Sequence, residues 1–282
     1  MQTLMLVAKR GNPEAAVLAK QIQEHYPDRT FLAEHHLAEV LGWDRSGPEH
    51  ELAARADLVI VLGGDGTFIH AARLVAGRPV PILGINLGSL GFMTEIPRRE
   101  AFAALDEVLA GRLTTDSRMK LSCRLLRADQ VIFQDEVLND VVIGKGALAR
   151  IGDHEMLVEG QYVTTFKADG VIVATPTGST AYSLSAGGPI VHPAVDCIIL
   201  TPICPHSLTQ VPIVVPGSQG VSVVLRGETE DFYLTLDGQA GLSLQSGDRL
   251  EVKRSQNRVI LVRNPRLDYF GMLRQKLRWG ER

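Results

Sequence analysis

A fully apolar pentapeptide at residues 58–62 runs directly into a glycine-rich turn. The residues read Leu-Val-Ile-Val-Leu, and Gly63-Gly64-Asp65-Gly66-Thr67-Phe68 follow at once. Residues 67–76 then have the pattern of a helix. A strand that is apolar on both faces and passes into a helix is typical of a parallel sheet covered by helices on both sides. This segment therefore predicts an α/β fold for the part of the chain around it.

Apolar runs and helical stretches alternate through residues 1 to about 115. Residues 4–7 and 81–85 predict two more buried strands. Residues 14–25 predict a helix, because apolar side chains recur at helical spacing after the turn Gly11-Asn12-Pro13. We expect a doubly wound α/β domain over residues 1–117.

From about residue 118 the pattern changes to short strands separated by turns. The apolar runs lie at 121–126, 131–133, 141–143, 156–158, 170–174, 221–225 and 231–236. The turn signals lie at 144–146, 187–189, 216–217, 237–238 and 246–248. They predict an antiparallel, all-β domain over residues 118–265. A helix is expected at 269–279, with residues 266–282 packing back on the first domain, and the two halves are expected to share a rigid cleft.

Composition narrows the classes of partner. The net charge of −3 over 282 residues gives no basic surface for nucleic acid. The apolar run near the N-terminus is too short for a secretory signal, and no window reaches the roughly 18 apolar residues of a membrane span. We expect a cytoplasmic protein with no membrane partner. The three cysteines are odd in number and form no CxxC pair, so we expect small buried side chains in a reducing compartment.

The turn at residues 63–67 suits phosphate, apart from its carboxylate. Glycines let backbone N–H groups approach phosphate oxygens, and a helix start adds unpaired donors. Asp65 would repel a phosphate, so it is expected to bind a phosphate-bearing metal ion or to take a proton from an attacking hydroxyl. The alternative is that Asp65 only caps the helix that begins near Thr67. Neither a Walker A loop nor a GxGxxG fingerprint is present.

Two later motifs carry polar groups between strands. Asn139 and Asp140 lie between two strand-like runs, where an amide and a carboxylate can read an adenine edge and a ribose hydroxyl together. The alternative is an Asx turn. Residues 167–189 combine a strand with a turn rich in hydroxyls and glycine, which suits a polyhydroxylated or phosphorylated ligand. The alternative there is a Ser/Thr-rich surface loop.

These motifs resemble a known family. Gly63-Gly64-Asp65-Gly66-Thr67 resembles the GGDGT signature of a superfamily that holds NAD kinases, diacylglycerol-type lipid kinases and phosphofructokinases. Residues 169–189 resemble, nearly residue for residue, the Asp-Gly…TPTGSTAYSLSAGGP signature of NAD kinases, which the other two groups lack. The resemblance continues through residues 192–193, 201–208 and 237–239 and covers essentially the whole chain.

The resemblance implies an NAD kinase, which transfers the γ-phosphate of ATP to the 2′-hydroxyl of the adenosine ribose of NAD to give NADP. NAD would lie in the cleft between an N-terminal α/β domain and a C-terminal all-β domain. Asp65 would be the catalytic carboxylate, and Mg²⁺ would arrive with ATP, with its protein ligands unknown. The ATP phosphates would lie over the turn that holds Gly63, Gly64 and Thr67. The NAD-contacting residues implied are Asp65, Gly66, His70, Asn139, Asp140, Arg150, Lys167, Asp169, Thr180, Ala181, Tyr182, Ser183, Leu184, Ser185 and Gln239.

The chain departs from the family pattern at two positions. Asp140 stands where members often carry Glu, and Lys167 stands where many carry Arg. Because lysine offers a point charge rather than a two-pronged fork, we expect looser discrimination of the product's 2′-phosphate. The alternatives are a related kinase with another acceptor and a non-catalytic NAD(P)-binding regulator. His70 has an alternative as an exposed residue in the first turn of its helix. Family members are homo-oligomers, so a homodimer or homotetramer is expected.

Overall fold

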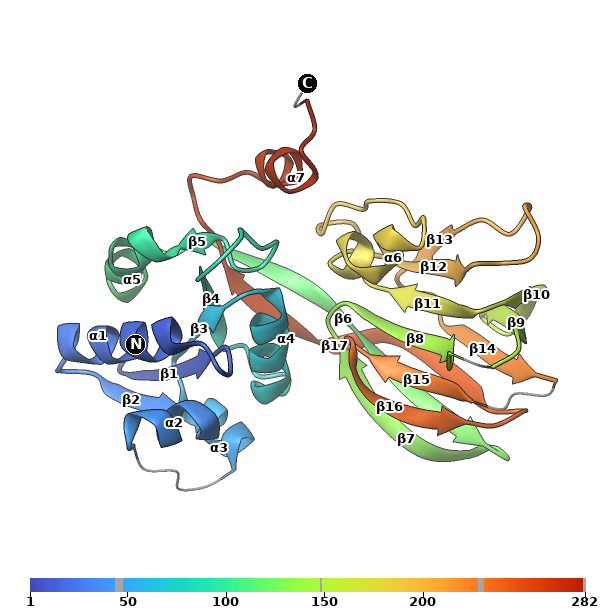
Figure 1. The fold of residues 1–282 in the computed structure, drawn as a ribbon, viewed down its shortest axis with the longest axis horizontal. Coiled ribbons are helices and arrows are strands. Elements are labelled where there is room, and N and C mark those ends of the chain that lie inside the picture. Colours follow the sequence, from blue (N-terminus) through green and yellow to red (C-terminus); the bar gives the residue numbers. More distant parts are fainter. Residues whose placement is uncertain (44–47, 148, 228–230, 281–282) are drawn as a thin grey trace. The chain divides into compact units, whose positions relative to one another are not determined.

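The computed structural model describes residues 1–43, 48–147, 149–227 and 231–280 and divides into two compact units. The first unit is Met1–Ser117 with Arg258–Arg282, and the second is Arg118–Asn257. Two long strands pass from one unit to the other, β6 (Thr115–Arg127) and β17 (Arg249–Val262) (Figure 1).

The first unit is built on a parallel sheet with the strand order β17-β4-β3-β1-β2, and β5 lies beside β4. The expected strands at 4–7, 58–62 and 81–85 are confirmed, each within one residue. The pattern gave no signal for β2, because it is only four residues long and three of them are partly or fully exposed. The strands are β1 (Thr3–Ala8), β2 (Thr30–Ala33), β3 (Leu58–Gly63), β4 (Pro81–Asn86) and β5 (Ile96–Pro97).

Helices pack on this sheet. The helix α1 begins at Pro13 because the Asn12 side chain accepts a hydrogen bond from the Glu14 N–H, and it buries Ala15, Leu18 and Ile22. Every residue of β3 is buried, so both faces of that strand are covered. The helices are α1 (Pro13–His25), α2 (His35–Leu41), α3 (Glu49–Arg55), α4 (Asp65–Leu74), α5 (Ala101–Leu109) and α7 (Tyr269–Leu277), with a 3₁₀ turn at Arg98–Glu100.

The second unit consists of two antiparallel sheets. One has the strand order β13-β12-β11-β8-β15-β16, and the other contains β10-β9-β14-β17 with β6 and β7 beyond β17. The antiparallel prediction is confirmed. The remaining strands are β7 (Gln130–Val137), β8 (Asp140–Lys145), β9 (Gly152–Val158), β10 (Gln161–Ala168), β11 (Gly170–Ala174), β12 (Cys197–Ile203), β13 (Ile213–Pro216), β14 (Val221–Arg226), β15 (Phe232–Leu236) and β16 (Gln239–Leu244).

The alternation of side chains along β8 and β15 separates a core face from an outer face. Val141 and Ile143 point into the apolar core that both sheets share, as do Leu234 and Leu236. The residues between them face the other way. Because Tyr233 and Thr235 lie on that outer face of the six-stranded sheet, it is available for polar chemistry.

Two expectations need correction. Gly144 and Lys145 belong to β8 and not to a turn, because they continue its pairing with β11 and β15. Cys123 and Cys197 are buried as expected, but Cys204 is exposed at a positive φ of 46°.

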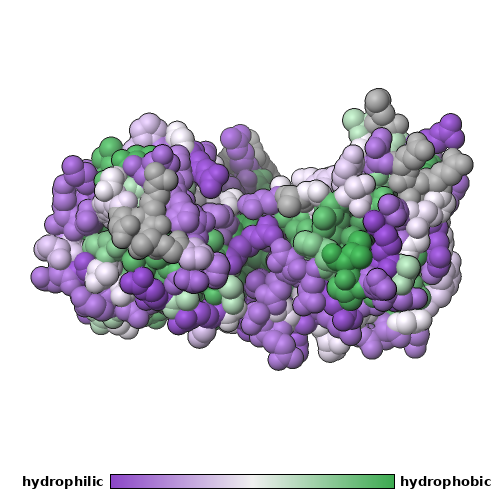
Figure 2. All heavy atoms as spheres, turned by 90° about the horizontal axis from the view of Figure 1, so that it is seen from below, coloured by the Kyte–Doolittle hydropathy of each residue, from purple (hydrophilic) through white to green (hydrophobic). Residues whose placement is uncertain are grey.

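The surface seen from below is largely hydrophilic, with an apolar area over the β-rich unit (Figure 2). Within the described ranges, no helix has the length and apolar character needed to cross a membrane.

Candidate active site

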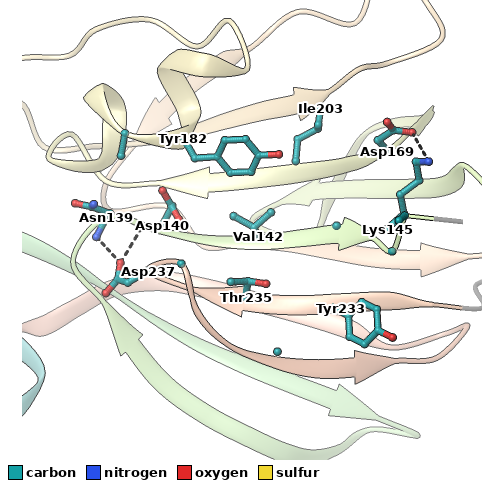
Figure 3. Close-up of a pocket in the computed structure, with 16 residues that line it drawn as sticks. Asn139, Asp140, Val142, Lys145, Asp169, Tyr182, Ile203, Tyr233, Thr235 and Asp237 are labelled. Atoms are coloured by element: carbon teal, nitrogen blue, oxygen red, sulfur yellow. Dashed lines mark hydrogen bonds and ion pairs between the residues drawn. The ribbon is translucent and has the colours of Figure 1, made fainter. Parts of the chain in front are cut away.

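A pocket of about 780 Å³ opens on the outer face of the six-stranded sheet in the second unit (Figure 3). Five of the residues expected to contact NAD line it together, although they come from separate parts of the chain: Asn139, Asp140, Asp169, Ala181 and Tyr182. Sequence reasoning missed several others that line it, namely Val142, Lys145, Ile203, Tyr233, Thr235 and Asp237. The outward alternation along β8 and β15 was the signal that could have found Val142, Tyr233 and Thr235.

One carboxylate fixes the backbone at the start of β8. Asp237 accepts hydrogen bonds from the N–H groups of Leu138, Asn139 and Asp140, at 3.0, 2.7 and 3.1 Å. Charge-assisted hydrogen bonds of this kind are stronger than neutral ones. Asp237 thereby sets the direction in which the side chains of Asn139 and Asp140 leave the backbone.

The hydroxyl-rich turn holds the same segment from a second side. Thr175 donates from Oγ1 to the Leu138 carbonyl at 2.6 Å, and its N–H donates to the Asn139 carbonyl at 2.8 Å. Gly178 lies so close that a Cβ there would be 2.1 Å from the Asn139 carbonyl oxygen. The glycine of this turn is therefore required by a close approach of two backbone segments.

Several hydroxyls of the turn have partners within the protein. Ser179 donates from Oγ to the Pro176 carbonyl at 2.7 Å, and Ser183 Oγ lies 2.8 Å from Thr201 Oγ1. Thr175, Ser179 and Ser183 are all fully buried. The hydroxyls of Thr175 and Ser179 therefore build the turn itself. The alternative of a surface loop is wrong, because these side chains are buried.

Asp140 is a nearly buried carboxyl beside a second carboxylate. It is 4% exposed, and burial, followed by the negative charge of Asp237, raises the pKa of Asp140 to about 7. A carboxyl group with this pKa changes between its protonated and ionised forms near neutral pH. It can therefore either donate or accept a hydrogen bond to a ligand in the pocket.

The other end of the pocket carries an ion pair. Lys145 Nζ lies 3.6 Å from Asp169 Oδ1, and Lys145 also donates to the Ala149 carbonyl at 3.2 Å. Both side chains are partly exposed, so the pair has a positive and a negative group available to a ligand. Sequence reasoning named Asp169 and missed its partner.

The remaining expected contacts of this unit are not among the residues that line the pocket. Arg150 and Gln239 are exposed, and the Lys167 ammonium, 62% exposed, lies 4.0 Å from Asp153. The other members are Thr180, Leu184 and Ser185, on the short helical turns Gly178–Thr180 and α6 (Tyr182–Ser185) or directly beside them.

The GGDGT turn lies at the carboxyl end of β3 in the first unit. The strand ends at Gly63, and α4 begins at Asp65 with Gly64 as its N-cap. Gly63 is required, because a Cβ there would lie 2.5 Å from Thr67 Oγ1. Gly66 is exposed in the first turn of α4, and His70 is half-buried one turn later.

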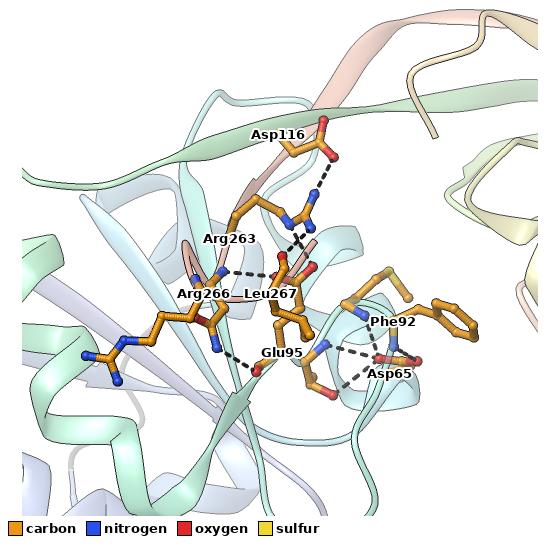
Figure 4. A network of polar contacts seen from close by, with 10 residues as sticks. Asp65, Phe92, Glu95, Asp116, Arg263, Arg266 and Leu267 are labelled. Carbon is orange, nitrogen blue, oxygen red and sulfur yellow. Dashed lines mark hydrogen bonds and ion pairs between the residues drawn. The ribbon is translucent and has the colours of Figure 1, made fainter. Parts of the chain in front are cut away.

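Asp65 does not cap this helix. Its carboxylate accepts hydrogen bonds from the N–H groups of Phe92, Met93 and Thr94, at 2.9, 3.0 and 3.2 Å, and from the Thr94 hydroxyl at 3.2 Å (Figure 4). No side chain caps α4. The alternative of a simple helix cap is therefore wrong. Asp65 is instead a half-buried carboxylate whose orientation is fixed by a loop far along the chain.

That loop, residues 86–95, is the part of the site that sequence reasoning missed entirely. It follows β4, which is the parallel neighbour of β3, and carboxyl ends of parallel strands meet at one edge of a sheet. Gly88 and Gly91 after a buried strand were the available signal. Gly91 leaves no room for a side chain, because a Cβ there would lie 2.2 Å from Asp65 Oδ1.

Comparisons with known proteins match both halves of the chain to the same family. The ATP-NAD kinase N-terminal domain matches residues 4–113, and the ATP-NAD kinase C-terminal domain matches residues 138–264. The chain is 50% identical to an NAD kinase of Geobacter metallireducens and 49% identical to one of Geotalea daltonii, with all of each chain covered.

Two solved structures share the fold. A yeast NADH kinase complexed with NADH superposes with a TM-score of 0.91 at 27% identity, covering 100% of this chain and 89% of that one. An NAD kinase from Archaeoglobus fulgidus in complex with ATP gives a TM-score of 0.77 at 25% identity, covering 98% and 99%. On the two family models and the relatives at about half identity, the chain belongs to the NAD kinase family.

Proposed function

We propose that this chain transfers the γ-phosphate of ATP to the 2′-hydroxyl of the adenosine ribose of NAD, with Asp65 as the base that accepts the hydroxyl proton. The observation that carries the role of Asp65 is its placement: a half-buried carboxylate at the start of α4, with both oxygens held by four donors. The family match supports the reaction, and the complexes of two relatives with NADH and with ATP support the two ligands.

The reaction asks the protein mainly for positioning and for neutralisation of charge. The 2′-oxygen forms a bond to the γ-phosphorus, the bond from that phosphorus to the bridging oxygen of ADP breaks, and the hydroxyl proton passes to Asp65. A positioned base contributes roughly 10²–10⁴-fold to such a step. A carboxylate that is already oriented does not have to be ordered as the reaction proceeds.

The pocket of the second unit is proposed to bind NAD. Tyr182 offers a half-exposed ring for stacking, and Asn139 and Asp140 offer an amide and a carboxyl that Asp237 has already oriented. Residues 118–265 would form the NAD-binding domain, and residues 1–117 with 266–282 would form the domain of the phosphate turn. The further NAD contacts proposed are Gly66, His70, Arg150, Lys167, Asp169, Thr180, Ala181, Ser183, Leu184, Ser185 and Gln239.

ATP is proposed to enter as its magnesium complex, with its phosphates over the turn at Gly63, Gly64 and Thr67. The start of α4 supplies backbone N–H groups and the positive end of the helix dipole to an anion. Mg²⁺ usually binds through substrate phosphates and few protein ligands. In the described ranges, no group of three or more His, Cys, Asp or Glu side chains is arranged as a metal site.

The assembly and location are also proposals. A homodimer or homotetramer is supported by edge strands of the β-rich sheets, among them β10 and β13, which carry exposed Tyr162 and Val214. A cytoplasmic location agrees with the largely hydrophilic face in Figure 2 and with the net charge of −3. Light scattering coupled to gel filtration measures the assembly directly.

The test of the function is product formation. Purified protein is incubated with NAD, ATP and Mg²⁺, and NADP is detected through an NADP-specific dehydrogenase, with the phosphate position assigned by NMR. We expect 2′-phosphorylated product. A folded protein that binds NAD but gives no product with ATP, another nucleoside triphosphate or polyphosphate would instead be a regulator. Phosphorylation of a lipid or a sugar phosphate in preference to NAD would make it a related kinase.

A further inference from the structure

All four donors that hold Asp65 come from one short segment, Phe92–Thr94. The orientation of the proposed base is therefore only as fixed as this segment is. Gly91, the residue before this segment, packs closely against the same carboxylate. A Cβ at Gly91 would lie 2.2 Å from Asp65 Oδ1 and 2.3 Å from Thr94 Oγ1. Asp65 and the segment thus form one close-packed unit, in which a shift of one partner displaces the other.

The N-terminal side of the segment is fixed by a buried asparagine. Asn86, 5% exposed, donates from Nδ2 to the Ser89 carbonyl at 2.6 Å and to Thr94 Oγ1 at 3.1 Å. It also accepts from the Gly88 N–H at 2.6 Å. Thr94 Oγ1 therefore accepts a hydrogen bond from Asn86 and donates one to Asp65. These two hydrogen bonds together orient the hydroxyl.

The C-terminal side is fixed by a buried ion pair. The carboxylate of Glu95, the residue directly after Thr94, is fully buried and lies 2.7 Å from Nε of Arg263 (Figure 4). The contact is an ion pair between the two side chains. Glu95 also accepts from the Asn264 N–H at 3.0 Å, and Arg263 reaches Asp116 at 3.4 Å.

A buried charge needs a reason. Removing a carboxylate from water costs free energy, and an ion pair in a good position offsets this cost. A well-packed apolar pair in the same place is often as stable. An ion pair does differ from an apolar pair in one way: it fixes direction as well as position. Glu95 connects the end of β17, where Arg263 and Asn264 lie, to the peptide that carries the Thr94 donors.

We infer that Glu95 is a positioning residue for the phosphoryl transfer: its ion pair with Arg263 fixes the segment Phe92–Thr94, and this segment fixes the carboxylate of Asp65. The inference rests on the proposed role of Asp65 as the base. It assigns no contact between Glu95 and either substrate. Its signature is a loss of turnover without a loss of NAD affinity, transmitted through Asp65.

The first test is Glu95→Gln, which keeps the shape of the side chain and removes its charge. We expect kcat to fall about 10-fold to 100-fold, the range expected for a displaced catalytic group, with KM for NAD little changed. The melting temperature should also fall, because Arg263 loses its charged partner in a buried position. The matched control is Glu100→Gln, a partly exposed glutamate that pairs with Arg99 at 3.3 Å and Arg266 at 4.0 Å. It removes the same charge nearby and should leave kcat unchanged.

The second test removes one donor without touching the ion pair. Thr94→Val lacks the hydroxyl that donates to Asp65 and should lower kcat with KM for NAD unchanged. Thr94→Ser restores the hydroxyl and should recover most of the turnover. This pair decides the case even where Glu95→Gln folds poorly. Equal kcat for the valine and serine variants, or a wild-type kcat for folded Glu95→Gln, would overturn the inference.

A double-mutant cycle separates the inference from the proposed function. If Glu95 acts through Asp65, Glu95→Gln should lower kcat in the wild-type background and have no further effect in the Asp65→Asn background. Equal losses in both backgrounds would show that Glu95 acts elsewhere and would overturn the inference alone. Wild-type turnover of Asp65→Asn would overturn the base assignment itself, and the inference with it.

Discussion

Asp65 in the first unit and Asp140 in the second are carboxylates with opposite surroundings. Asp65 receives three backbone N–H groups and one hydroxyl. The donors nearest to Asp140, the N–H groups of residues 138–140, are instead taken by Asp237, and burial beside that second carboxylate raises the pKa of Asp140 to about 7. The fold fixes the direction of the Asp65 carboxylate, and it makes the protonation of Asp140 sensitive to pH near neutrality.

This difference fits the two proposed roles, Asp65 as the base and Asp140 as a group that recognises NAD. A base in phosphoryl transfer needs a defined direction toward the hydroxyl, and a loop of donors provides that. A group that recognises a ligand gains from being able to donate or accept, and a carboxyl with a pKa near neutrality provides that.

The largest effect is expected from crowding Asp65. Gly91→Ala places a methyl group 2.2 Å from Asp65 Oδ1, so we expect kcat to fall roughly 10²-fold and the free energy of unfolding to fall by about 1–3 kcal/mol. The matched control is Gly88→Ala in the same loop, whose Cβ meets nothing within 4 Å. Steady-state kinetics and urea unfolding measure both variants. Similar kcat values for the two would show that Asp65 is not held as described.

The next effect concerns Asp237, the carboxylate that accepts from the N–H groups beside Asp140. Asp237→Ala leaves the N–H groups of residues 138–140 without their acceptor, so we expect a loss of about 1–3 kcal/mol in the free energy of unfolding. Since Asn139 and Asp140 lose their support, KM for NAD should rise more than kcat falls. Calorimetry and kinetics give both quantities. A raised KM with unchanged stability would mean that Asp237 contacts NAD rather than the backbone.

Asp140 should also leave its mark on the pH dependence of stability. Its folded pKa of about 7 lies above the unfolded 3.8, so the folded state binds the extra proton between these values. The stability it contributes is full below about pH 4 and is lost as the pH rises through 7. Asp140→Asn cannot ionise, so at pH 8 it should be more stable than the wild type by about 1–2 kcal/mol. Melting curves at pH 5 and pH 8 test this, and an equal gain at both would contradict it.

The smallest effect comes from a buried histidine, His154, whose pKa is lowered by burial against the opposing effects of a hydrogen bond to Ala168 and the charge of Asp153. His154 is fully buried near Phe166 and Phe232, and burial lowers its pKa to about 4. The stability it contributes is full above its unfolded pKa of 6.5 and is lost as the pH falls toward 4.

The variant His154→Leu should therefore lose less stability than the wild type between pH 6 and pH 5, by about 1 kcal/mol. The control is His206→Gln, because His206 is exposed. The stability of this variant should change with pH as that of the wild type does. The measurement is urea unfolding at both pH values. Parallel curves for the wild type and His154→Leu would contradict the burial of a neutral imidazole.

The sequence revealed what local patterns determine. The run 58–62 and the glycines after it predicted β3 and its turn, because an apolar strand and a glycine turn are properties of adjacent residues. The helix was expected from residue 67 and begins at Asp65, since Gly64 serves as the N-cap without offering a side chain. The elements α2, α3 and β2 gave no signal, because each is short and only partly buried.

The site was predictable in its residues more than in its contacts. Asn139, Asp140, Asp169, Ala181 and Tyr182 were named and lie together. The donors to Asp65 were not, because backbone N–H groups 27 to 29 residues away carry no signature of residue type. The same holds for Asp237, which binds backbone groups nearly one hundred residues earlier, and for Glu95 with Arg263. Such pairings depend on which strand ends the fold brings together.

The proposed role of Asp65 as the base is measured most directly by the single-turnover rate of NADP formation by Asp65→Asn at saturating NAD and ATP. Asparagine keeps the shape of the side chain but cannot accept the hydroxyl proton. Because the variant lacks the base, we expect a rate roughly 10²–10⁴-fold below that of the wild type, with NAD affinity and fold preserved. A folded Asp65→Asn protein that forms NADP at the wild-type rate would contradict it.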